Sequence, residues 1–495
     1  MNLGKSTLIT FPLFLFAFSL PGCRTATAPE PTMPIRGYQL DISRMKVPTM
    51  ATLYRMVDIL AALDYNQFQL YTEHAFAYPG HEAVWEEFSP MTADEIRALD
   101  KYCAARGIEL VPNQNSFGHL DQWLCRYPYN ELAEVPQGGA VYKPWGNCVI
   151  RTPSALCPTD ARSIPFIASL YDALFPCFKS KLVNVGCDET LELEDARALN
   201  RSAKTVAEKG VHRVYLDFLL KIHREVASRG HTMMFWGDII VNAPELVPEL
   251  PEEVIALCWG YEGNHPFDKQ CGLFAQAKRR FMVCPGTSAW GSISGRVPNM
   301  IANIDNAYAA ALKHGAEGML LADWGDGGHP NPWIVSIPAL VYFSAKTHGR
   351  TLSEDELAME IDRLLGCTIG AALLEYGKVY ETCGARKGNS TELFLALSHH
   401  ENYTRSKDLT NENLAAALRR RNQAVKLADL NGAAPWISDD FQMLDLLYRA
   451  VALRFADPDM KNFRARFEPE YRALWLKQNR PGGLSASLTA LFGPF

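Results

Sequence analysis

The chain has 495 residues, of which 48% are hydrophobic and 21% are charged. These proportions are ordinary for a globular protein, and they exclude fibrous and intrinsically disordered classes. The net charge is −6 and basic residues cluster only in Arg419-Arg420-Arg421, so we expect no nucleic-acid partner. We interpret that run as the solvent-facing side of a helix. A chain of this length holds roughly two or three domains.

The N-terminal segment has the pattern of an export signal. Its apolar stretch, Leu8–Leu20, is too short for a comfortable membrane span. The next residues, Leu20-Pro21-Gly22-Cys23, are similar to the lipobox of bacterial lipoproteins, and that resemblance implies cleavage before Cys23 and a lipid on its thiol. A small, polar, proline-rich tether follows. We expect a signal peptide at 1–22, a lipidated tether at 23–32, and an exported protein anchored to a membrane, in the periplasm or at the cell surface.

Residues 33–350 alternate short apolar runs with amphipathic helical stretches, which is typical of repeated strand–helix units. The apolar runs are Gly37–Ile42, Gln67–Tyr71, Ile108–Pro112, Leu182–Gly186, Met233–Phe235, Val254–Leu257, Met282–Cys284 and Met319–Ala322. Eight strands separated by helices predict an α/β fold, the (β/α)8 or TIM barrel. The active site of such a barrel lies at the carboxyl ends of the strands, where this sequence collects polar and aromatic residues.

The pattern changes after Gly349. Ser353-Glu354-Asp355-Glu356 is a capping box that predicts a helix ending at Gly366. Further helical patterns follow at Ala371–Glu381, Asn413–Leu430, Phe441–Phe455 and Asn462–Gln478. We therefore expect a catalytic barrel at 33–350 and a smaller all-helical C-terminal domain at 351–495. A long insertion after the third strand, residues 113–162, is expected to form one wall of a pocket.

An acidic pair, Asp188 and Glu189, stands at the end of the fourth predicted strand. Adjacent carboxylates raise the cost of ionising one another, so this position favours a chemical use over a surface turn. Tryptophans at neighbouring strand ends suit the apolar face of a sugar ring. Ordinary retaining glycosidases take two carboxyls about 5 Å apart from different strands. Neighbours in sequence therefore indicate unequal roles. Glu192, just after the pair, is expected in the solvated first turn of a helix.

The segment from Asn184 to Glu189, NVGCDE, resembles the H-x-G-G-D-E signature of glycoside hydrolase family 20, the β-N-acetylhexosaminidases. Similar matches occur at residues 36–44, RGYQLDISR, at Thr72-Glu73 and at Phe117-Gly118-His119. The resemblance implies an exo-acting enzyme that hydrolyses terminal N-acetylglucosamine or N-acetylgalactosamine from glycans by a substrate-assisted retaining mechanism. It implies no cofactor. The 12 cysteines form no CxxC pair or Cys/His cluster, so we expect no metal site either.

The resemblance also implies a role for each matched residue. Asp188 orients the substrate's acetamido group, Glu189 is the general acid and base, and Glu73 and His119 tune Glu189. Substrate binding falls to Arg36, Trp236, Trp259, Trp324 and Asp326, the last two from a Trp-Gly-Asp segment similar to the family's W-x-E.

Several points stay open at this level. Asn184 and Cys187 replace a histidine and a glycine of the family signature. Tyr261 is a candidate for the tyrosine that holds the acetamido carbonyl, or a plain loop residue. Two other functions also fit: a conventional retaining glycosidase with Asp238 or Asp326 as nucleophile, and a surface glycan-binding lipoprotein without activity.

Overall fold

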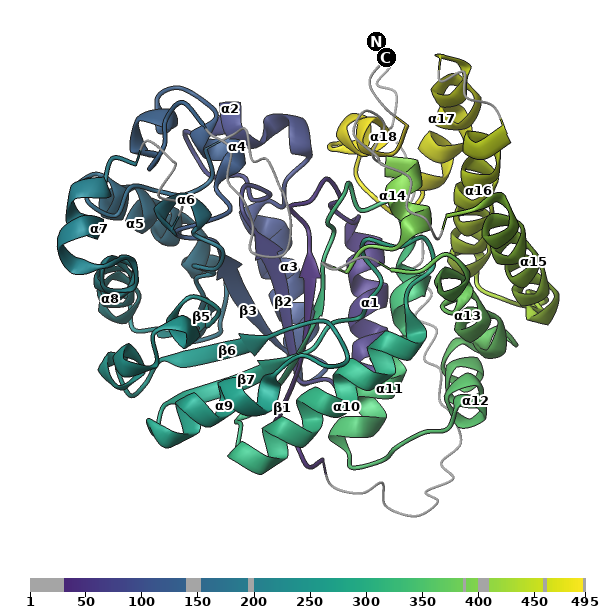
Figure 1. Ribbon diagram of the computed structural model, residues 1–495, viewed down its shortest axis with the longest axis horizontal. Coiled ribbons are helices and arrows are strands. Elements are labelled where there is room, and N and C mark those ends of the chain that lie inside the picture. The colour runs from purple at the N-terminus through teal and green to yellow at the C-terminus, as the bar shows by residue number, and fades with distance from the viewer. Residues whose placement is uncertain are drawn as a thin grey trace, which may run out of the picture. The chain divides into compact units, whose positions relative to one another are not determined.

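Eight parallel strands close into a barrel in sequence order (Figure 1). They are β1 (Ile35–Asp41), β2 (Gln67–Thr72), β3 (Glu109–Gln114), β4 (Leu182–Asn184), β5 (Thr232–Trp236), β6 (Ile255–Trp259), β7 (Arg280–Cys284) and β8 (Gly318–Asp323). The register of β8 against β1 runs from Gly318 beside Ile35 to Asp323 beside Leu40, which closes the sheet. The predicted eight-stranded α/β barrel is confirmed.

The computed structural model describes residues 31–138, 153–194, 200–385, 389–398, 409–456 and 461–492. The predicted signal peptide and Cys23 lie outside the described residues, as does all of the tether before Pro31. Pro31–Phe495 forms one compact unit. Among the helices of the described part, none is long and apolar enough to cross a membrane.

Most helices of the barrel region lie between successive strands, and the last, α11, follows β8. They are α1 (Met50–Ala62), α2 (Glu82–Trp85), α3 (Ala93–Ala104), α4 (Asp121–Leu124), α5 (Ser163–Leu174), α6 (Leu191–Glu194), α7 (Ala203–Lys209), α8 (Val211–Ser228), α9 (Phe267–Gln276), α10 (Val297–His314) and α11 (Ile337–Thr347). Local sequence sets their starts: at α3, Thr92 Oγ1 accepts from the backbone N–H of Glu95, whose carboxylate accepts from the N–H of Thr92.

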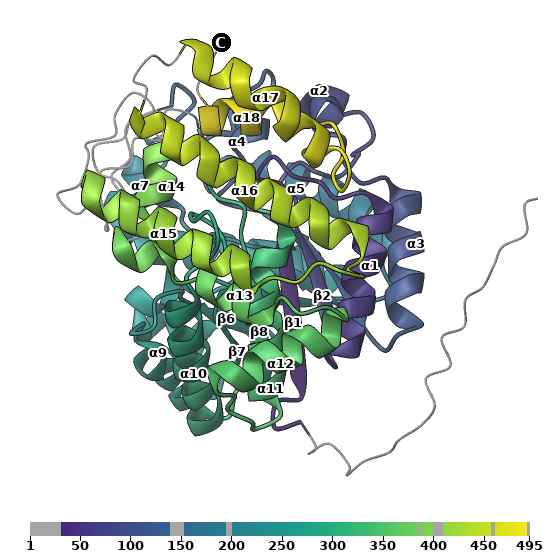
Figure 2. The same ribbon diagram turned by 90° about the vertical axis from the view of Figure 1, so that its right-hand side faces the viewer.

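The chain after residue 350 is helical. It forms α12 (Glu354–Leu365), α13 (Gly370–Tyr376), α14 (Glu392–Ser398), α15 (Asn411–Leu427), α16 (Pro435–Ala456), α17 (Lys461–Trp475) and α18 (Leu484–Phe492). The predicted capping box at Ser353 and the helix end at Gly366 are both present. α15, α16 and α17 lie beside the barrel in Figure 1, and Figure 2 shows them in a row in front of it. The sequence did not predict α14 and α18, because such short helices are hard to recognise by their periodicity.

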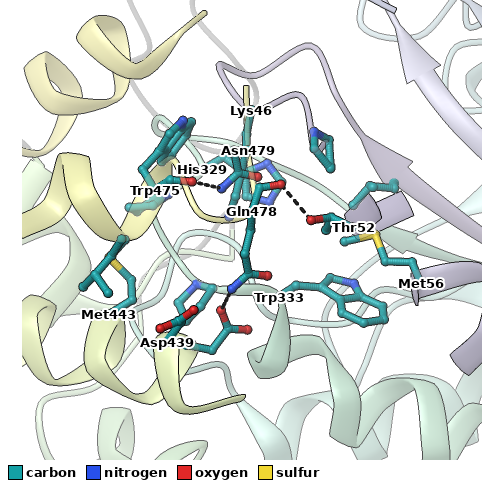
Figure 3. A pocket seen from close by; sticks show the side chains of 16 residues that line it. Lys46, Thr52, Met56, His329, Trp333, Asp439, Met443, Trp475, Gln478 and Asn479 are labelled. Atoms are coloured by element: carbon teal, nitrogen blue, oxygen red, sulfur yellow. Dashed lines mark hydrogen bonds between the residues drawn. The ribbon is translucent and has the colours of Figure 1, made fainter. Parts of the chain in front are cut away.

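These C-terminal helices are fastened to the loops of the barrel. Ser487 Oγ donates to the carbonyl of Gly328 over 2.7 Å, and Ser294 Oγ lies 2.6 Å from Tyr448 Oη. A cavity of about 30 Å³ lies at this junction, lined by side chains from both sides such as Lys46, Trp333 and Trp475 (Figure 3). The helices therefore support the loop that follows β8.

The inside of the barrel is partly polar. Asn113 and Asn184 each donate from Nδ2 to Gln69 Oε1 over 3.1 Å, and Gln69 Nε2 donates to Gln67 Oε1 over 3.0 Å. These hydrogen bonds link the amides across β2, β3 and β4, although Asn113 Oδ1 has no partner among the described residues. A second, apolar group of buried side chains, which includes Trp236, fills the barrel toward the carboxyl ends of its strands.

Candidate active site

A pocket of about 570 Å³ opens at the carboxyl ends of the strands, a size typical of small-molecule sites. The predicted residues in its lining are His119, Asp188, Glu189, Trp236, Trp259, Trp324 and Asp326. Arg44, Asp238 and Tyr261 line it as well. The barrel thus brings together side chains from six different strand ends.

The acidic pair sits on a turn that begins earlier than the sequence predicts. β4 ends at Asn184, and the backbone then takes positive φ at Gly186 (67°), Cys187 (70°) and Glu189 (45°). Asn184 Oδ1 accepts from the N–H of Gly186 over 3.0 Å. Non-glycine residues with positive φ are costly and collect at functional sites. Asn184, a departure from the family signature, is therefore part of what holds this turn.

Asp188 is paired with His119. His119 Nε2 lies 3.2 Å from Asp188 Oδ2, and Asp188 is buried. Burial raises the pKa of Asp188, but the charge and hydrogen bond of His119 outweigh it, so the pKa is lowered. Burial lowers the pKa of His119, yet Asp188 and, less strongly, Glu189 raise it to about 9. The pair is therefore an anion beside a cation at neutral pH.

Glu189 has a different set of contacts. Its Oε2 lies 3.7 Å from His119 Nε2, and its backbone N–H donates to Asp238 Oδ2 over 3.1 Å. Its side chain is 13% exposed. The two neighbouring carboxyls thus differ in environment: Asp188 is the closer partner of the histidine, and Glu189 is held through its main chain.

Glu73 contacts Arg44, and Arg44 in turn contacts His119. Arg44 Nε lies 3.3 Å from Glu73 Oε1, and its Nη2 lies 3.4 Å from His119 Nδ1. Burial raises the pKa of Glu73 to about 7, although Arg44 and His119 lower it. Tyr71 Oη donates to the same Glu73 oxygen over 2.9 Å. Arg44, which had no assigned role from the sequence, therefore lies between Glu73 and His119.

Arg36 lies at the opposite end of the barrel, and the prediction that it binds substrate is corrected. It is the second residue of β1, and its Nη2 pairs with Asp64 Oδ2 at 2.9 Å. Its guanidinium also donates to the carbonyls of Met33, Pro34 and Asp64. Arg44, from the same sequence segment, occupies the pocket instead, because it follows the carboxyl end of the strand. The position of Arg44 after the carboxyl end of β1 could have identified it from the sequence as a pocket residue.

Aromatic side chains form the rest of the lining. Trp236 and Trp324 lie 5.8 Å apart between ring centroids, and Tyr261 stacks on Trp259 at 5.2 Å. Trp324 Nε1 donates to Tyr261 Oη over 2.7 Å. Tyr261 is therefore a pocket residue with a fixed hydroxyl rather than a plain loop residue. Trp290, also at a strand end, packs edge-on behind Tyr261 at 5.0 Å.

Glu192 is buried, contrary to the expectation of a solvated helix turn. Its Oε1 accepts from the backbone N–H of Ser154 over 2.6 Å, and Ser154 Oγ donates to the same carboxylate over 2.9 Å. Ser154 belongs to the long insertion at 113–162, so this contact ties the insertion to the segment after Glu189. Of the insertion's described residues, His119 lines the pocket.

Comparison with known proteins gives one family. The model of glycosyl hydrolase family 20, catalytic domain, matches residues 33–286, which is half of the chain. A beta-hexosaminidase of Akkermansia muciniphila is 29% identical over 227 residues, which are 42% of this chain and 45% of that protein. The match therefore spans less than half the length of this relative.

Two solved structures share the fold. A chitobiase of Flavobacterium johnsoniae aligns with a TM-score of 0.52 and 17% identity over 90% of this chain and 78% of that one. An exo beta-N-acetylglucosaminidase of Vibrio harveyi, in complex with N-acetylglucosamine, aligns with a TM-score of 0.50 and 14% identity over 68% of this chain and 59% of that one. By the extent of the family match, the chain belongs to glycosyl hydrolase family 20.

Proposed function

We propose that the protein is an exo-acting β-N-acetylhexosaminidase that removes terminal N-acetylglucosamine or N-acetylgalactosamine from glycans by a substrate-assisted retaining mechanism. Family membership and the names of the relatives support this activity. The observation that carries it is the unequal pair in the turn after β4: Asp188 Oδ2 lies 3.2 Å from His119 Nε2, and Glu189 stands beside it with separate contacts.

In this mechanism the substrate supplies the nucleophile. Asp188 accepts the N–H of the 2-acetamido group, and the acetamido oxygen attacks the anomeric carbon. Glu189 gives its proton to the leaving glycosidic oxygen as that bond breaks, which leaves an oxazolinium intermediate. Glu189 then takes a proton from water as the water opens the intermediate with retention. The anionic Asp188 stabilises the positive charge that develops on the acetamido nitrogen.

The remaining lining suits an acetamido sugar. Trp236, Trp259 and Trp324 present apolar faces to the acetamido methyl group and the sugar ring. We assign to Tyr261, whose hydroxyl accepts from Trp324 Nε1, the hydrogen bond to the acetamido carbonyl. We assign the sugar hydroxyls to Arg44 and Asp326, whose Nε and Oδ1 atoms lie 3.9 Å apart at the pocket. Pairs of charged groups like this one serve as donors and acceptors for neighbouring hydroxyls.

The test is the hydrolysis of chromogenic aryl glycosides. We expect turnover of the N-acetyl-β-glucosaminide, much slower turnover of the plain β-glucoside, and inhibition by a thiazoline that mimics the cyclic intermediate. Comparable rates on both substrates, with a fluorosugar trapped on Asp238 or Asp326, would instead establish a conventional retaining glycosidase. No turnover of either substrate would leave a glycan-binding protein.

We also propose that the chain is a lipoprotein anchored through Cys23, with the barrel at 33–350 and a helical domain at 351–495. The lipobox-like residues before Cys23 support the anchor, and the run of helices after Gly349 supports the division. Labelling with a radioactive fatty acid tests the anchor: the wild type should incorporate it and Cys23→Ser should not. Labelling of both proteins would rule out Cys23 as the site.

A further inference from the structure

A third carboxyl group, that of Asp238, shares the pocket with Asp188 and Glu189. It follows β5, and its Oδ2 accepts the backbone N–H of Glu189 over 3.1 Å. Glu189 has a φ of 45°, so its main chain needs a fixed partner to stay in place. Asp238 supplies that partner from a neighbouring strand end.

The positively charged side chains of the pocket lie beside carboxyl groups other than that of Asp238. His119 lies 3.2 Å from Asp188 and 3.7 Å from Glu189, while Arg44 pairs with Asp41, Glu73 and Asp326. Among the described residues, no lysine, arginine or histidine lies within ion-pair distance of Asp238. An ionised carboxylate with so little compensation is expensive when one of its oxygens, here Oδ1, is shut off from water.

Both aspartates have one buried oxygen without a hydrogen-bond partner among the described residues. These atoms are Asp188 Oδ1 and Asp238 Oδ1, each enclosed away from solvent. Carboxyl groups that share a site do not both ionise readily, and the usual solution is one proton for the pair. The histidine on Asp188 decides which of the two carries the negative charge.

We propose that Asp238 is a positioning residue that works as a neutral carboxylic acid: its Oδ2 holds the main chain of Glu189, and its retained proton leaves Asp188 as the only anion of the two aspartates. The positioning part of this proposal rests on the proposed roles of Asp188 and Glu189. The proton on Oδ1 removes the negative charge from that enclosed oxygen.

The electrostatics of the pocket agree with this division. Burial and the charge of Asp188 raise the pKa of Asp238 well above its ordinary value, and Glu189 adds to the rise. The N–H of Glu189, in the turn after β4, and the indole of Trp259, the last residue of β6, lower the pKa of Asp238 but are outweighed. The pKa of Asp188 moves down, so the two groups separate as an acid and an anion.

Two substitutions test the role by activity. Asp238→Asn keeps the shape of the side chain. Its amide offers an oxygen that can accept from the Glu189 N–H, and its N–H group replaces the O–H of the acid. We therefore expect kcat to stay within about tenfold of wild type. Asp238→Leu removes the acceptor, and kcat on the aryl N-acetyl-β-glucosaminide should fall about 10²-fold with little change in KM, the usual effect of misplaced catalytic groups. If the leucine variant does not fold, as judged by circular dichroism, Asp238→Ala is assessed by the same criterion.

Two outcomes would contradict the proposed role of Asp238. An asparagine variant as inactive as Glu189→Gln would mean that Asp238 acts through its charge or as a nucleophile, which overturns the proposal. Full activity of the leucine variant would overturn the positioning role.

Infrared difference spectroscopy tests the proton without relying on activity. Because Glu73 can also be protonated at neutral pH, the measurement is the difference spectrum of wild type minus Asp238→Asn. We expect it to contain a protonated-carboxyl C=O band, and a difference spectrum without that band would refute the neutral acid. A wild type without activity on the acetamido substrate would refute the proposed function, and the infrared band would still decide the state of Asp238.

Discussion

His119 lies closer to Asp188 than to Glu189: its Nε2 is 3.2 Å from the aspartate oxygen and 3.7 Å from the glutamate oxygen. The family resemblance led us to expect that the histidine tunes Glu189. The geometry gives it a second task, which is to keep Asp188 ionised inside a buried site. A group that lowers the pKa of an acid extends the pH range over which the anion exists.

The pH profile should therefore report His119. In His119→Gln the cation is gone, so the pKa of Asp188 rises, and the acid limb of kcat/KM should move to higher pH along with a fall in rate. Measuring kcat/KM of the aryl N-acetyl-β-glucosaminide across pH checks this. His231→Gln, at the amino end of β5, is the control and should leave the limb in place. An acid limb that does not move in His119→Gln would show that Asp188 does not depend on the histidine.

Glu189 should be indispensable for turnover. Glu189→Gln keeps the shape of the side chain but cannot give or take the proton, so kcat should fall about 10²–10⁴-fold, the usual worth of general acid–base catalysis. Asp188→Asn should be similarly damaging, since the amide carries no charge for the oxazolinium. The exposed Glu87→Gln serves as the control in the same assay. Activity of Glu189→Gln within a few-fold of wild type would contradict the assignment of Glu189 as the general acid and base.

Arg44 and Arg36 form a matched pair for kinetics and stability. Arg44→Ala should lower kcat/KM about 10–100-fold, because hydrogen bonds from a charged group are worth about 1.5–3 kcal/mol. Arg36→Ala should leave kcat/KM almost unchanged and reduce the free energy of unfolding in urea, since it loses its bonds to Asp64 and to three carbonyls. The reverse pattern would restore Arg36 as the sugar-binding arginine.

Glu73 should make stability depend on pH. Its pKa rises from an ordinary 4.5 to about 7 on folding, so the folded protein binds this proton more tightly than the unfolded chain. The stabilisation that this proton gives to the folded protein is complete below pH 4.5 and is lost as pH rises to about 7. The change in the free energy of unfolding is on the order of 3 kcal/mol. Glu73→Gln should remove this part of the slope, as measured by urea unfolding at several pH values. Parallel slopes for the two proteins would contradict the shift.

The contact between Glu192 and Ser154 should matter for stability. Glu192→Ala leaves the N–H and the hydroxyl of Ser154 buried without an acceptor, which costs about 1–3 kcal/mol in the free energy of unfolding. Ser154→Ala removes the hydroxyl alone and should cost less, since the backbone bond to Glu192 persists. Equal losses in the two variants would mean that the N–H bond contributes nothing.

The barrel was predictable because each strand is an apolar run that ends in polar or aromatic residues. That Asp188, Glu189 and three tryptophans line one pocket was predictable for the same reason. Arg36 and Arg44 show where that reasoning stops. Both stand in one nine-residue match, and only the bounds of β1 decide that one lies at the amino end and the other beyond the carboxyl end.

The hydrogen bonds that join residues far apart in the chain could not be predicted from the sequence. Asp238 bonds the N–H of Glu189 across 49 positions, and Glu192 bonds Ser154 across 38. No local period or motif encodes such pairs. Glu192 looked like a solvated acid because acids in a first helical turn usually are, and only the packing of the insertion buries it.

The register of β8 against β1 sets the smallest piece of this protein that can work. The family match ends at residue 286, before β8 begins at Gly318. A fragment trimmed to the matched residues would keep both carboxyls of the acidic pair, yet β1 and β7 would become open sheet edges, which invite aggregation. It would also lack Trp324 and Asp326. The closure of β8 on β1, rather than the end of the family match, therefore marks where a fragment with a complete barrel can end.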